Sequence, residues 1–226
     1  MRRSGWLQQG KYLAKRQLAR MGLSLVTHRN PTQKPVLEFI YQIRSERQML
    51  LHDHEAAQLY YAVQSVRRVP GDLAEVGCYR GASAKLIRRA DPAKLLRLFD
   101  TFAGLPEPEI QDRGEFCAGA FDCSLEDVAA YLGPDDRISF HPGLFPKDTG
   151  KQVEECKFSF VHLDVDLYRS TLDSLEFFHP RLSRGAVLIV HDYLLSGVHQ
   201  AVAEFSERLA ETFIPLNGTQ VLFVKG

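Results

Sequence analysis

Residues whose side chains could do chemistry gather in two short runs of the 226-residue chain. The run HLDVDLYRST contains Asp164 and Asp166, and the run VHDY contains His191 and Asp192. Carboxylates and imidazoles bind Mg²⁺, Mn²⁺, Zn²⁺ or Fe²⁺, and a histidine near its ordinary pKa can accept a proton. The set Asp164, His191 and Asp192 is therefore a candidate metal site or a site of acid–base chemistry. Acidic residues also cap strand ends and helix N-termini without a metal, and spacing alone slightly favours that interpretation.

A glycine turn in the first half of the chain indicates a binding site. The segment EVGCYRG runs from Glu75 to Gly81, after a short apolar run, and its glycines allow a sharp turn close to a ligand. Asp100 ends the next apolar run, 25 residues after Glu75, where a carboxylate can accept both hydroxyls of a ribose. Nicotinamide cofactors and S-adenosylmethionine both carry a ribose, so these features do not choose between them. A plain strand-to-helix turn remains the alternative.

The elements that position these residues alternate between strand and helix from residue 72 onward. Strands are predicted over 72–78, 95–102, 137–143, 157–166 and 186–193. Helices are predicted over 45–69, 81–90, 124–133, 197–210 and from 170 onward. Asn217-Gly218 lies between two apolar runs and predicts a hairpin within 212–226. The pattern predicts an α/β fold with a mostly parallel sheet, helices on both faces and one antiparallel edge.

Ligands of such sheets bind beyond the carboxyl ends of the strands. The residues that end or follow the predicted strands should therefore converge on one crevice: Gly77–Gly81, Asp100, Gly143, Asp164–Asp166 and His191–Asp192. Residues 103–123 hold proline and glycine breakers and two phenylalanines, and they form a candidate lid or a plain surface connection.

Charge divides the chain unevenly, although its formal net charge is zero. Residues 1–37 carry eight basic residues and no acid, and residues 38–226 carry a net charge of −8. The basic arm is a solvated tail, an oligomer contact or an anchor to an anionic surface. The overall balance argues against a general nucleic-acid binder, and no run of residues is apolar enough to span a membrane. Four cysteines without a CxxC pair indicate reduced thiols and a cytoplasmic location.

Several motifs resemble the macrocin/mycinamicin O-methyltransferase family. They are LAEVGCYRGASA, LFDTFAGLPEPE, SLEDVAAYLG, HPGLFPKDTG and the run from FVHLDVDLYRST to VLIVHDY, in the same order over roughly residues 70–205. The resemblance implies a Rossmann-like class I methyltransferase fold with a seven-stranded, mostly parallel sheet and a C-terminal antiparallel hairpin. The domains expected are a basic arm (1–37), a helical extension or lid (38–70) and a Rossmann-like domain (71–226).

The resemblance also implies roles for individual residues. S-adenosylmethionine would be held by Glu75, Gly77, Tyr79, Gly81, Ser83, Asp100, Thr101, Gly143 and Asp164. The family binds Mg²⁺ through three carboxylates, and Asp164 would be the first of them here. The other two form an Asp-Asp pair before a tyrosine, and this chain has His191-Asp192 at that place. His191 could remain a ligand with a changed metal preference, the site could lack a metal, or the imidazole could serve as the base.

The function expected is methyl transfer from S-adenosylmethionine to a hydroxyl, with Asp164 and His191 as catalytic residues. The acceptor expected is a small molecule or saccharide, such as an antibiotic sugar, a cell-surface saccharide or a lipid-linked sugar. The alternatives are a metal-independent methyltransferase with His191 or His162 as the base, and a non-catalytic S-adenosylmethionine-binding protein. A nicotinamide-dependent oxidoreductase has little support, because GxGxxG and YxxxK motifs are absent. A homo-oligomer is a further possibility for the assembled protein.

Overall fold

The computed structural model describes residues 33–226. The basic arm predicted over residues 1–37 lies almost wholly outside the described residues, so its role stays a prediction. Residues 37–226 form one compact unit, to which the fold described below belongs. The division between an extension (38–70) and a Rossmann-like domain (71–226) also stays a prediction.

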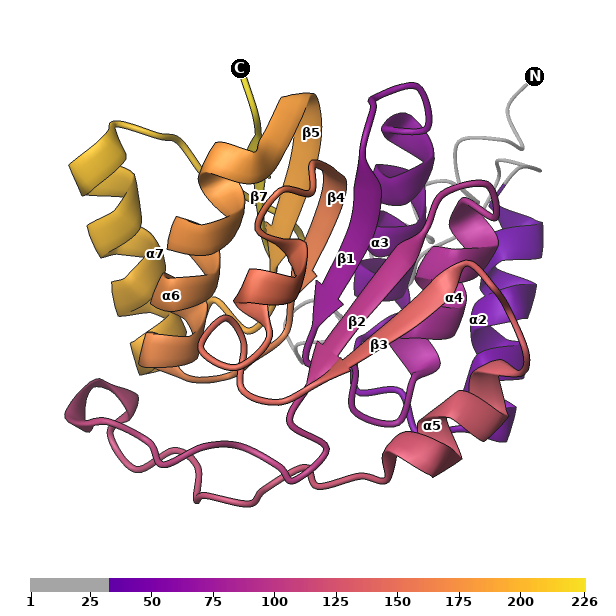
Figure 1. Ribbon diagram of the computed structural model, residues 1–226, viewed down its shortest axis with the longest axis horizontal. Helices are drawn as coiled ribbons and strands as arrows, with labels where there is room; N and C mark the ends of the chain where they lie inside the picture. Colours follow the sequence, from indigo (N-terminus) through magenta and orange to yellow (C-terminus); the bar gives the residue numbers. More distant parts are fainter. Residues whose placement is uncertain (1–32) are drawn as a thin grey trace, which may run out of the picture. The chain divides into compact units, whose positions relative to one another are not determined.

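Seven strands form one sheet in the order β3-β2-β1-β4-β5-β7-β6 (Figure 1). Strands β1 to β5 are parallel, whereas β7 runs antiparallel to both β5 and β6. Their bounds are β1 Asp72–Val76, β2 Leu96–Asp100, β3 Ile138–Pro142, β4 Phe158–Leu163, β5 Leu182–Val190, β6 Ile214–Pro215 and β7 Val221–Val224. This confirms the predicted Rossmann-like α/β sheet with its C-terminal hairpin. The strand order reverses between β1 and β4, which is where such sheets bind ligands.

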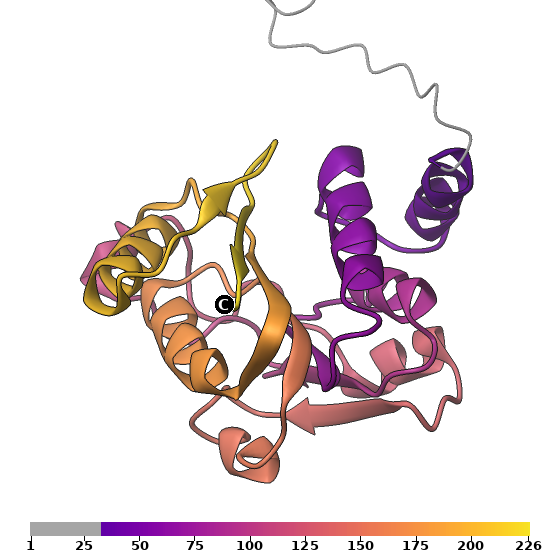
Figure 2. The same cartoon turned by 90° about the horizontal axis from the view of Figure 1, so that it is seen from above.

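The described residues form six α-helices. Figures 1 and 2 show α6 and α7 packed together on one face, and α3 and α4 on the other. Their bounds are α2 Lys34–Glu46, α3 Asp53–Ser65, α4 Ala82–Ala90, α5 Leu125–Leu132, α6 Tyr168–Phe178 and α7 Ser196–Leu209. Three short 3₁₀ turns, η1 Ile110–Asp112, η2 Gly150–Val153 and η3 His179–Arg181, lie in the connections.

The helical extension differs in detail from the sequence prediction. A single helix over 45–69 is wrong, because residues 47–52 are not helical and separate α2 from α3. Pro35 lies in the first turn of α2. Proline fits there because the first N–H groups of a helix have no intrahelical partner.

Local signals set several of the predicted boundaries. The Ser124 hydroxyl accepts the Asp127 N–H at 3.2 Å and caps α5, and Gly133 ends that helix at φ 77°. Strand β4 is buried along its whole length, as expected of a central strand covered on both faces. The cap and the glycine confirm the predicted start and end of α5.

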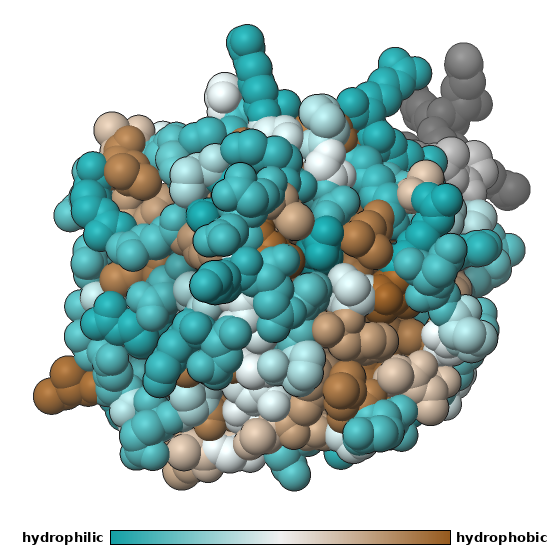
Figure 3. Space-filling model, in the orientation of Figure 1, coloured by the Kyte–Doolittle hydropathy of each residue, from teal (hydrophilic) through white to brown (hydrophobic). Residues whose placement is uncertain are grey.

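The molecular surface carries no sign of a membrane-embedded helix in the part of the chain that the structure describes. No helix within residues 33–226 is both long enough and apolar enough to cross a bilayer. Figure 3 shows a largely hydrophilic face, on which apolar side chains gather toward the lower right.

Candidate active site

One pocket lies at the carboxyl ends of the parallel strands and encloses about 850 Å³ of space, part of it open to solvent. The predicted convergence of strand ends is confirmed. The predicted residues that line it are Gly77, Tyr79, Asp100, Thr101, Gly143, Asp164, Asp166, His191 and Asp192. Most of the remaining lining is apolar and includes Leu50, Phe116, Phe121 and Phe145.

The glycine turn is shaped by the close approach of β1 and β4. Gly77 has φ +82°, and a Cβ placed on it would lie 1.8 Å from the carbonyl oxygen of Asp164. The Asp164 N–H donates to the Val76 carbonyl at 2.9 Å, so the two strand ends are joined here. Gly81 has φ +80° and begins α4. The turn therefore fixes Asp164 beside the residues predicted to bind the cofactor.

Asp100 lies at the end of β2 with its carboxylate at the pocket. Its Oδ2 accepts the Tyr79 N–H and its Oδ1 accepts the Phe102 N–H, both at 2.9 Å. Burial raises the pKa of Asp100, and these two N–H groups oppose the rise. Each carboxylate oxygen keeps further acceptor capacity, so the side chain can still accept hydroxyls from a ligand. This geometry fits the predicted contact with a ribose.

Glu75 and His162 lie inside the sheet, outside the pocket lining. Both side chains are fully buried, and Glu75 Oε1 lies 2.9 Å from His162 Nδ1. Burial raises the pKa of Glu75, although His162 opposes the rise. Ser83 lines a smaller neighbouring cavity together with Gly77 and Asp164. The cofactor roles of Glu75 and Ser83 stay predictions. The fully buried His162 does not line the pocket.

His191 lies at the centre of the candidate catalytic cluster, directly after β5. Its Nδ1 lies 3.0 Å from Asp164 Oδ1 and 3.1 Å from Asp192 Oδ2. One ligand atom from each of the three residues lies within 4.8 Å of the others. The structure therefore brings together the three residues predicted as a metal or acid–base site. Asp192 reaches it from a left-handed backbone, at φ 55°.

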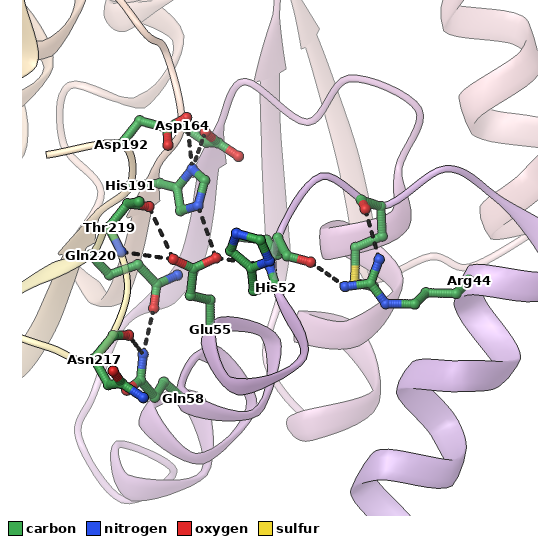
Figure 4. A network of polar contacts seen from close by, with 12 residues as sticks. Arg44, His52, Glu55, Gln58, Asp164, His191, Asp192, Asn217, Thr219 and Gln220 are labelled. Atoms are coloured by element: carbon green, nitrogen blue, oxygen red, sulfur yellow. Dashed lines mark hydrogen bonds and ion pairs between the residues drawn. The ribbon is translucent and has the colours of Figure 1, made fainter. Parts of the chain in front are cut away.

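Glu55 is a fourth member of the cluster that sequence reasoning missed. It belongs to α3, is almost fully buried, and its Oε2 lies 3.5 Å from His191 Nε2 (Figure 4). In the sequence, Glu55 follows His52 by three residues, a spacing typical of a helix capping box. That signal predicts a cap and gives no hint of contact with residue 191.

The cluster strongly perturbs its own ionisable groups. Burial alone would lower the pKa of His191, but the carboxylates of Asp164, Asp192 and Glu55 outweigh burial and raise it far above its ordinary value. Burial opposes ionisation of Asp164 as well, yet His191 holds its pKa below the usual range. For Asp166, burial together with the charges of Asp164 and Asp192 outweighs the opposing charge of His191 and raises the pKa to about 8. Groups this perturbed are typical of functional sites.

The segment 103–123 borders the pocket and supplies part of its aromatic lining. The rings of Phe116 and Phe121 lie 5.7 Å apart, and Phe121 meets Tyr79 at 5.8 Å. The buried Asp112 joins the segment to the start of α6, because its carboxylate accepts the Tyr168 N–H at 2.7 Å. The Tyr168 hydroxyl donates to Glu204, away from the pocket lining.

Comparisons with known proteins agree with this architecture. The family model described as Macrocin-O-methyltransferase (TylF) matches residues 48–225. The chain is 34% identical to an 8-demethyl-8-(2,3-dimethoxy-alpha-L-rhamnosyl)-tetracenomycin-C 4'-O-methyltransferase of Streptomyces olivaceus, over 73% of this chain and 70% of the relative. It is 29% identical to the mycinamicin III 3''-O-methyltransferase of Micromonospora griseorubida, over 66% of each chain. Among solved structures, the O-methyltransferase NovP matches with a TM-score of 0.67 and 26% identity, over 78% of this chain and 81% of that one.

Proposed function

The chain belongs to the macrocin O-methyltransferase family, and from this we propose that it transfers a methyl group from S-adenosylmethionine to a hydroxyl of a sugar or glycosylated natural product. The observation that carries the proposal is that one pocket holds both Asp100 and the Asp164–His191–Asp192 cluster. The first can hold the donor, and the second can act on the acceptor's hydroxyl.

The donor end of the site is formed by the turn after β1 and by Asp100. The Gly77–Gly81 turn brings backbone close to the methionine part of the cofactor, and Asp100 accepts hydrogen bonds from the ribose hydroxyls. Thr101 and Gly143 line the same end of the pocket. Methyl transfer from a sulfonium is an in-line displacement, so alignment of the methyl group with the acceptor oxygen supplies much of the rate.

The cluster fits a divalent metal in the chemistry and spacing of its donors. Two carboxylates and one imidazole can share one ion, because His191 Nδ1 lies 3.0 Å from Asp164 Oδ1 and 3.1 Å from Asp192 Oδ2. The imidazole favours Mn²⁺, Fe²⁺ or Zn²⁺ over Mg²⁺, which prefers an all-oxygen set. Asp164, His191 and Asp192 would hold the ion, which supplies Lewis-acid assistance to loss of the acceptor's proton.

The metal-independent alternative, with His191 as the base, has weaker support. Both ring nitrogens of His191 face carboxylates, and these raise its pKa far above neutrality. Without a metal, an imidazole that is already protonated cannot take the acceptor's proton, whereas a bound ion would displace the proton from Nδ1. The family match also favours a methyltransferase over a nicotinamide-dependent enzyme or a cofactor-binding protein without activity.

The proposed function is tested by supplying methyl-labelled S-adenosylmethionine and a panel of hydroxyl acceptors to the full chain. The panel holds deoxysugar glycosides of macrolides and aromatic polyketides, free nucleotide-linked sugars, and catechol as a non-sugar control. We expect labelled product from sugar acceptors, detected by mass spectrometry, and none from catechol. Binding of the cofactor without turnover on any sugar acceptor would contradict the proposal.

Removal of divalent metal is expected to abolish activity. Treatment with a chelator should lower turnover at least about 100-fold, since metal assistance to a poor nucleophile contributes several kcal/mol. Readdition of Mn²⁺ should restore more activity than readdition of Mg²⁺, because one ligand is an imidazole. Rates are measured over a series of metal concentrations. Full activity in chelator would eliminate the metal and restore the metal-independent alternative.

A further inference from the structure

We propose that Glu55 is a positioning residue: it holds His191 through Nε2 and leaves Nδ1 directed at the point shared by Asp164 and Asp192. This inference rests on the proposed function of the cluster. It assigns part of the catalytic apparatus to α3, a helix outside the Rossmann-like core. Figure 4 shows Glu55 behind the ring of His191, on the side opposite Asp164 and Asp192.

Every other contact of the Glu55 carboxylate is with a donor. Oε1 accepts the Thr219 N–H at 2.7 Å and its hydroxyl at 3.0 Å, and Oε2 accepts the His52 N–H at 2.8 Å. An ionised carboxylate can only accept hydrogen bonds. Burial alone would raise the pKa of Glu55, but the His191 imidazole, helped by the Thr219 and His52 N–H groups, lowers it below its ordinary value. The hydrogen bonds from Thr219 and His52 thus fix the orientation of the carboxylate beside His191.

The donor–acceptor rules then determine whether the ring nitrogen that faces Glu55 carries a proton. Because Glu55 only accepts, His191 Nε2 must carry a proton to lie stably beside it. The Nε2–Oε2 distance of 3.5 Å is long for a hydrogen bond, and contacts of this kind often shorten when a site is occupied. In the neutral ring, a proton on Nε2 leaves the Nδ1 lone pair facing Asp164 and Asp192. Nδ1 can lie 3.0 Å from Asp164 Oδ1 and 3.1 Å from Asp192 Oδ2 only with a cation or a proton between these acceptors.

The pattern matches a general feature of metal-binding histidines. A ligating histidine usually donates its other ring N–H to a carboxylate, which fixes the tautomer and the ring orientation. Glu55 fills that role from α3, and Thr219 in the turn before β7 holds it in place. Residues from two separate parts of the chain, α3 and the turn before β7, therefore orient the one imidazole in the cluster.

Glu55→Gln tests the proposal with little change in volume. One amide oxygen cannot replace both carboxylate oxygens, because the Thr219 and His52 N–H groups lie on opposite oxygens and the negative charge beside Nε2 is lost. In ¹⁵N-histidine spectra of the full chain, we expect wild-type His191 Nε2 to carry a proton and the His191 ring signals to shift in the variant. His191→Asn identifies the resonance among the eight histidines. A wild-type Nε2 without a proton, or a variant with unchanged His191 signals, would overturn the proposal; the wild-type spectrum decides alone if the variant does not fold.

Gln58→Ala is the matched control. Gln58 lies one turn further along α3 and donates to the Asn217 carbonyl and to Gln220, so it joins the same helix to the same hairpin without touching Glu55. We expect wild-type imidazole signals in this variant. If the same imidazole signals changed in Gln58→Ala as in Glu55→Gln, helix packing and not Glu55 would orient the ring.

Kinetics supply a second readout. Glu55→Gln is expected to lower kcat about 10–100-fold, the usual effect of losing such a partner, with KM for S-adenosylmethionine unchanged within about twofold. A rise in that KM with unchanged kcat would speak against a positioning role. If no acceptor is methylated by the wild type, the proposed function fails, whereas the state of Nε2 still decides the role of Glu55.

Discussion

Asp164→Asn is expected to reduce methyl transfer about 10³-fold while binding of S-adenosylmethionine stays within about threefold. The Asp164 carboxylate lies 3.0 Å from His191 Nδ1 and carries one of the negative charges of the cluster. Asparagine keeps the size of the side chain but removes that charge and one acceptor oxygen. Metal assistance and proton transfer each contribute two or more orders of magnitude, and both depend on this carboxylate.

Single-turnover rates and calorimetric titration of the cofactor separate the two effects. Asp173→Asn is the matched control, because Asp173 is a half-exposed carboxylate on α6 that pairs with Arg169 and does not line the pocket. We expect wild-type rates in that variant. If the Asp164→Asn enzyme kept more than a tenth of the wild-type rate, a catalytic role for Asp164 would be excluded.

Asp100→Ala is expected to weaken binding of S-adenosylmethionine about 10²–10⁴-fold. Two ribose hydroxyls donating to a carboxylate contribute about 1.5–3 kcal/mol each, and 1.4 kcal/mol corresponds to a tenfold change in affinity. The substitution also frees the N–H groups of Tyr79 and Phe102, which now donate to the carboxylate and shape the turn. Both effects act on the cofactor end of the pocket.

The measurement is calorimetric titration with S-adenosylmethionine and with S-adenosylhomocysteine. Asp100→Asn should fall between wild type and alanine, because an amide oxygen still accepts one hydroxyl. Methionine alone, which lacks the ribose, should compete equally weakly against either form of the protein. Unaltered cofactor binding in Asp100→Ala would exclude Asp100 as the ribose ligand.

The sheet could be predicted from the sequence because each of its signals is local. Buried parallel strands appear as short apolar runs, and Asn217-Gly218 marks a hairpin by itself. The break between α2 and α3 has no comparable signal: residues 47–52 contain neither proline nor glycine. That segment leaves the helix for tertiary reasons, including the Arg44 guanidinium, which donates to the Met49 carbonyl at 2.9 Å and to the Leu51 carbonyl.

The sequence could predict those residues of the candidate site that lie at the ends of parallel strands. Strand ends of a parallel sheet meet at one edge, so Asp100, Asp164 and His191 could be placed together without coordinates. Glu75 was predicted from the same turn, yet alternation along β1 directs its side chain onto His162 inside the sheet. Glu55 could not be found, because its partners His191 and Thr219 lie more than 130 residues away.

The contact of Glu55 with Thr219 also sets an order of events during synthesis of the protein. The strands that form the pocket are all complete once Val190 has been made, but Thr219 is still to come. Until then the buried Glu55 carboxylate lacks two of its hydrogen bonds, which is a costly state for an ionised group inside a protein. The five parallel strands can therefore be made before the residue that holds Glu55 in place, and catalytic competence depends on the C-terminal hairpin, the last part of the sheet to be added.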